Sequence, residues 1–148
     1  MPTLIDALNL KSDPTPLQLL GEAGFLWSYL SRWGESQDVF KALVALVPQD
    51  ACGHLGLAEV ELMQNNYRQS QQYAEQAVKA SIGRSDANDD DRATAARAFV
   101  IIAKAQMHQK KPEEAKQSYM KVIELDPQGV SGRHAADMIE YGTLVGAV

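Results

Sequence analysis

The sequence predicts an all-α protein in which three antiparallel helix pairs stack on one another, with a flanking helix at each end. The composition favours helix, because alanine, leucine, glutamine, glutamate and lysine are common and only six prolines occur in 148 residues. Three segments share one pattern, two helical stripes separated by a short polar turn: residues 17–50, 51–84 and 96–129. One pair cannot bury its apolar face alone, so we expect all pairs to pack into a single domain spanning residues 1–148.

Small residues stand at matching positions on the two helices of each segment, where they let the helices approach closely. They are Gly24 and Ser36, Ala58 and Ser70, and Ala103 and Ala115. Phe40 and Tyr119 are expected to fill the space towards the next pair. Pro48 and Pro127 have no N–H to donate, so each is expected to end a second helix, whereas Ile82 stands at this position in the second segment.

This pattern, with its 34-residue unit, resembles the tetratricopeptide repeat. The resemblance covers about residues 17–129 and is clearest in the third segment, through Phe99, Ala103, Ala115, Tyr119 and Pro127. It implies a right-handed superhelix in which the first helices of successive pairs line a concave groove. The sequence departs from the repeat where large apolar or aromatic residues are usual: His54, Glu61 and Gln106.

Residues 85–95 form an acidic insertion between the second and third segments. We expect a solvated loop with an aspartate capping the next helix, and the alternative is that the preceding helix runs on. Asp86, Asn88 and Asp90 match the first, third and fifth positions of a calcium-binding EF-hand loop. Asp91 and Arg97 stand where that loop needs glycine and glutamate, so we expect no calcium site.

The two flanks carry helical patterns of their own. Residues 3–10 contain Leu4, Ile5 and Leu8, which indicates a short amphipathic helix. Residues 131–144 indicate a final helix that caps the last pair, as terminal repeats require.

The charge pattern argues against nucleic acid as a partner. The net charge is -5, the isoelectric point is about 5.1, and the lysines and arginines are scattered. The start of the chain lacks the basic and apolar regions of a secretory leader, and no run of 18 apolar residues occurs. We therefore expect a cytoplasmic protein that does not insert directly into a membrane.

No catalytic or metal-binding motif occurs. Phosphate-binding glycine loops, H-E-x-x-H, C-x-x-C and G-x-S-x-G are all absent, and the three histidines are far apart in sequence. Cys52, the single cysteine, is interpreted as a small packed residue, with a reactive thiol near a helix start as the alternative. We expect no enzyme activity, no cofactor and no metal.

The repeat resemblance implies which residues face the groove. The partner-binding set is Phe25, Tyr29, Leu55, Glu59, Leu62, Met63, Arg97, Val100, Ile101, Lys104 and Met107. Some tetratricopeptide co-chaperones clamp a partner's carboxylate with basic residues, but here the corresponding positions hold only one basic residue, Arg97. The apolar members of the set predict a trough for an extended or helical peptide with apolar anchors. The competing interpretation is that many of them pack against flanking helices.

A closer resemblance is to the class II chaperones of bacterial type III secretion. It rests on residues 24–30, on Trp33, on residues 40–43 with Pro48, and on Leu-Gly-Leu-Ala at residues 55–58. Those acidic proteins hold translocator subunits in an apolar groove, and a short N-terminal helix often makes a homodimer, which the resemblance implies for this chain as well. The resemblance implies a non-catalytic module that keeps a client protein soluble. The alternative function is a structural scaffold or adaptor within a larger bacterial assembly.

Overall fold

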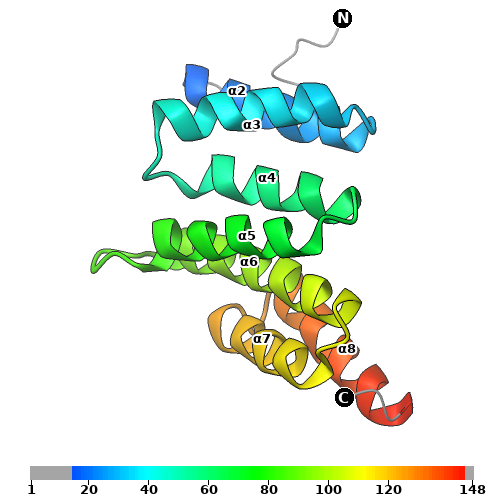
Figure 1. The fold of residues 1–148 in the computed structure, drawn as a ribbon. Coiled ribbons are helices and arrows are strands. Elements are labelled where there is room, and N and C mark those ends of the chain that lie inside the picture. Colours follow the sequence, from blue (N-terminus) through cyan, green and yellow to red (C-terminus); the bar gives the residue numbers. More distant parts are fainter. Residues whose placement is uncertain (1–14, 146–148) are drawn as a thin grey trace, which may run out of the picture.

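The structure, a computed structural model, describes residues 15–145, which form seven helices and no strand. Figure 1 shows the helices stacked along one array, with the first pair at one end and α8 at the other. The helices are α2 (Pro16–Tyr29), α3 (Trp33–Leu46), α4 (Ala51–Met63), α5 (Tyr67–Ile82), α6 (Asp89–His108), α7 (Pro112–Leu125) and α8 (Val130–Val145).

The helix contacts define three pairs and a closing helix. Each helix packs on the next one in sequence, and α2 also contacts α4, α4 contacts α6, and α6 contacts α8. The pairs are therefore α2–α3, α4–α5 and α6–α7, which is the all-helical repeat architecture that the sequence predicts. The final helix expected over residues 131–144 corresponds to α8. The helix expected over residues 3–10 lies outside the described residues.

The turn inside each pair has the same geometry, because one residue adopts a positive φ. The three residues are Ser31, Asn65 and Lys110, with φ of 59°, 65° and 61°. In each turn the next N–H donates to a carbonyl five residues earlier: Arg32 to Trp27 (2.8 Å), Asn66 to Glu61 (2.8 Å) and Lys111 to Gln106 (2.9 Å). This left-handed C-terminal motif satisfies helix-end carbonyls and reverses the chain.

Small side chains lie between paired helices at the positions identified above. The Ser36 hydroxyl donates to the Gly24 carbonyl at 2.9 Å, and the Ser70 hydroxyl donates to the Ala58 carbonyl at 2.7 Å. Both hydrogen bonds are buried, so each serine links its helix to the helix paired with it.

Two of the polar departures from the repeat pattern are satisfied by hydrogen bonds inside the fold. The buried Glu61 carboxylate accepts from Gln37 Nε2 and from Asn66 Nδ2, both at 2.7 Å. The buried Gln106 amide oxygen accepts from the Ser118 hydroxyl at 2.7 Å. These pairings explain why polar residues are tolerated where apolar ones are usual.

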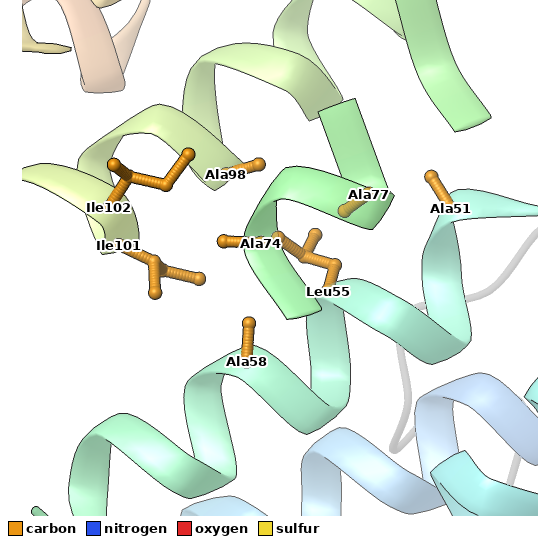
Figure 2. Close-up of a cluster of buried hydrophobic side chains, with 8 residues drawn as sticks. All are labelled: Ala51, Leu55, Ala58, Ala74, Ala77, Ala98, Ile101 and Ile102. Carbon is orange, nitrogen blue, oxygen red and sulfur yellow. The ribbon is translucent and has the colours of Figure 1, made fainter. Parts of the chain in front are cut away.

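The core is made mostly of small aliphatic side chains. Figure 2 shows the central cluster, in which three neighbouring helices meet through the residues Ala51, Leu55, Ala58, Ala74, Ala77, Ala98, Ile101 and Ile102. Alanines on α4, α5 and α6 let these helices pack closely, because they add almost no side-chain bulk at the contact.

The acidic insertion differs from the expectation of a loop over residues 85–95. Helix α5 ends at Ile82 and α6 begins at Asp89, so the second half of the insertion is helical. The N-cap is Asn88 and not an aspartate: Asn88 Oδ1 accepts from the Asp91 N–H at 2.9 Å, and Asp91 Oδ2 accepts from the Asn88 N–H at 3.0 Å. This reciprocal capping box, together with the acidic first turn, suits the positive end of the helix dipole.

Candidate functional site: the concave groove

The concave face carries a groove of about 840 Å³ between α2, α4, α6 and α8. Nine of the expected partner-binding residues line it: Phe25, Tyr29, Glu59, Leu62, Met63, Arg97, Val100, Ile101 and Lys104. They come from the first helix of each pair, because these helices lie side by side on one face of the array.

Two expected residues do not line this groove. Leu55 is 3% exposed and packs in the core cluster with alanines of α5, and it borders only a smaller neighbouring hollow. Met107 is half-buried near the end of α6 and is not among the lining residues. The repeat resemblance implied a groove-side position for both, but the neighbouring helices decide which face of a helix is covered.

Other lining residues were missed by sequence reasoning. Val130, Ser131 and His134 come from the start of α8, Ser31 comes from the turn after α2, and Trp33 is the first residue of α3. The sequence predicts only a capping role for α8. Because α8 contacts α6 in the manner of a further first helix, it also extends the concave face.

Large apolar side chains are exposed along the groove. Tyr29, Met63 and Val130 are 87%, 60% and 77% exposed, while Phe25 and Leu62 are half-buried. Ile101, by contrast, is only 4% exposed and belongs mainly to the core. Apolar side chains gathered in a concave surface are typical of a protein-binding site.

A polar bridge crosses the floor of the concave face. Arg97 Nη2 of α6 lies 2.8 Å from Glu59 Oε1 of α4, and the Arg97 guanidinium lies 5.4 Å from the centre of the Phe25 ring of α2. Arg97 and Phe25 border both the groove and the neighbouring hollow. The bridge therefore separates the groove from the hollow. The one basic residue at a carboxylate-clamp position thus already has an acidic partner.

At the α6–α8 end of the groove, a histidine lies beside a cation. Burial and the positive charge of Lys104 lower the pKa of His134, against an opposing effect of Asp137. His134 Nε2 and the neighbouring Tyr119 hydroxyl are buried without a hydrogen-bond partner among residues 15–145. Their rings meet edge-on, with centroids 6.1 Å apart. This end of the groove favours the neutral imidazole.

Cys52 does not have the environment of a reactive thiol. Burial, followed by the negative charges of Asp50 and Glu22, raises its pKa to about 11. The thiol is therefore protonated at neutral pH, which agrees with the packed-residue interpretation. Within residues 15–145, no group of three or more His, Cys, Asp or Glu side chains is placed to hold a metal ion.

Comparison with known families places a repeat in the third helix pair. Residues 96–128 match the family model described as a tetratricopeptide repeat, and no curated protein matches the chain at a significant level. The match and the stacked helix pairs support a tetratricopeptide-repeat protein, and repeats of this family are generally non-catalytic modules of protein–protein interaction. No helix in the described part of the chain has the length and apolarity needed to cross a membrane.

Proposed function

We propose that this protein binds an apolar segment of a client protein in the groove and acts in the cytoplasm as a chaperone of the type III secretion class. The observation that carries the proposal is the exposure of Tyr29, Met63 and Val130 around one concave surface. Covering such side chains with a client's apolar anchors removes apolar area from water on both partners. The sequence resemblance to class II secretion chaperones supports the choice of client, a membrane-active translocator subunit.

The experiment is co-expression with a translocator subunit of a type III system from the same bacterium, followed by affinity purification. The groove variant is Tyr29→Glu with Met63→Glu, because both side chains are exposed and their replacement leaves the core intact. Ile101 is unsuitable for such a test, since it is buried and a charge there would unfold the protein. We expect the wild type to retain the subunit and the variant to lose at least tenfold in recovery.

Met120→Glu is the matched control, because Met120 is 50% exposed on α7 and does not line the groove. This variant should retain the subunit as the wild type does. If the groove variant also retained it, the groove would not be the binding site. Recovery of structural components of an assembly, without a translocator subunit, would favour the scaffold function instead.

A further inference from the structure

One face of α2 carries an apolar stripe that no helix covers among residues 15–145. Leu19, Ala23, Leu26 and the C-cap residue Leu30 follow one another at alternating steps of four and three residues, so they lie along one face of the helix. Leu26 and Leu30 are 40% and 53% exposed, and Leu19 and Ala23 are half-buried. None of the four lines the groove.

The positions of Leu19, Ala23 and Leu26 are buried in the following pairs, whereas the position of Leu30 is only half-buried there. On α4 the equivalents of Ala23 and Leu26 are Leu57 and Val60, which are at most 2% exposed and cluster with Phe40 and Leu43 of α3. Each stripe therefore packs on the second helix of the preceding pair.

Helix α6 repeats this arrangement one pair later. Ala98 and Ile102, at the positions of Leu19 and Ala23, cluster with Ala74 and Ala77 of α5. By equivalence, the α2 stripe is a repeat interface suited to one further helix on its N-terminal side.

We propose that residues 3–10 of the same chain form this helix and pack on the α2 stripe. The segment carries Leu4, Ile5 and Leu8, which can supply an apolar face. A helix of eight residues is not stable alone in water, so packing on α2 would be what holds it. The segment would close this end of the array as α8 closes the other.

Two features of the chain favour the same molecule over a second copy. Residues 11–15 join the segment to α2, and they are comparable in length to residues 47–50 and 126–129, which fold a helix back onto the next one. Pro14 also stands one 34-residue unit before Pro48, which follows the end of α3. A tether this short gives the segment a high effective concentration at the α2 stripe, so packing within one chain is favoured over dimerisation.

The first test is a coupling experiment on the full chain. Deleting residues 1–10 should lower the urea midpoint of unfolding, and so should Leu26→Asp. Because both changes break the same contact, the double variant should unfold at the midpoint of the deletion alone. Met120→Asp, on the exposed side of α7, should shift the midpoint equally with and without residues 1–10. Additive shifts for the deletion and Leu26→Asp would overturn the proposal.

The second test is disulfide trapping, which also identifies the molecule that supplies the helix. Cys52→Ser removes the native thiol, and Leu8→Cys or Ile5→Cys is then combined with Leu26→Cys. We expect a cross-link within one chain in at least one combination, with a monomeric mass in light scattering. A cross-linked dimer, or a dimeric mass that residues 1–10 are needed to maintain, would show that a second copy occupies the stripe. No cross-link in either combination would also count against the proposal.

Discussion

The ring of Phe40 occupies the space where Gly56 has no side chain. A β-carbon added to Gly56 would lie 2.2 Å from Phe40 Cε1, and one added to Gly24 would lie 2.7 Å from Phe40 Cζ. The Phe40 ring, which comes from α3, is thus enclosed between glycines of α2 and α4, and the Phe25 ring meets it edge-on at a centroid distance of 4.8 Å. The first two pairs are joined through this contact.

We expect Gly56→Ala to lower the free energy of unfolding by about 1–3 kcal/mol, because the ring has to move in a packed core. The control is Gly34→Ala on α3, where an added β-carbon meets nothing within 4 Å. That change should raise stability by up to about 1 kcal/mol through helix propensity. Urea unfolding followed by circular dichroism measures both. Equal effects of the two substitutions would contradict the close packing of Phe40.

The buried hydroxyl of Tyr119 has no hydrogen-bond partner among the described residues, although the ring itself is packed in the core. We expect Tyr119→Phe to leave stability unchanged or to raise it by about 1 kcal/mol, because an unsatisfied polar group is removed from the interior. Tyr119→Ala should instead cost about 3–5 kcal/mol through the cavity it leaves. Thermal unfolding of both variants separates the two effects, and a marked loss in Tyr119→Phe would mean that the hydroxyl has a partner.

His134 should make the protein less stable as the pH falls. Its pKa is lower in the folded than in the unfolded chain, through burial and the charge of Lys104, so the unfolded chain binds more protons below about pH 6.5. Its contribution to stability is complete above that pH and is lost as the pH falls through the folded pKa. The melting temperature of His134→Gln should therefore fall less than that of the wild type between pH 7.5 and pH 5.

Lys104→Gln gives an independent check on this titration. Without the neighbouring positive charge, the pKa of His134 should rise towards its ordinary value, which reduces the pH sensitivity of the melting temperature. An unchanged pH dependence in both variants would show that another group is responsible.

The Cys52 thiol should react slowly in the folded protein. Because its pKa is raised to about 11, the thiolate is scarce at pH 7.5, and the side chain is also half-buried. We expect alkylation by iodoacetamide, followed by mass spectrometry, to be at least tenfold slower in the folded protein than in 8 M urea. A comparable rate in both states would show that Cys52 is accessible and ionised.

The sequence by itself determined the helix pairs, because their signals are local. The close approach of paired helices at small residues such as Ser36 and Ser70 depends only on helix geometry. The end of a helix before a proline such as Pro48 depends only on the missing N–H. The groove side of α2, α4 and α6 came instead from the resemblance to the tetratricopeptide repeat. The expected aspartate cap of α6 was wrong, because asparagine and aspartate are both good caps and several of them stand together before Asp91.

Only the tertiary structure decided which side chains on those faces remain exposed. Leu55 and Met63 both lie on α4, yet one is buried against α5 and the other is open to solvent, because the neighbouring helix covers only part of the face. The pairing of Arg97 with Glu59 and the position of His134 in the groove likewise depend on how separate helices meet. Local periodicity sets the face of each helix, but burial and charge pairing are set by the stacking of one pair on the next.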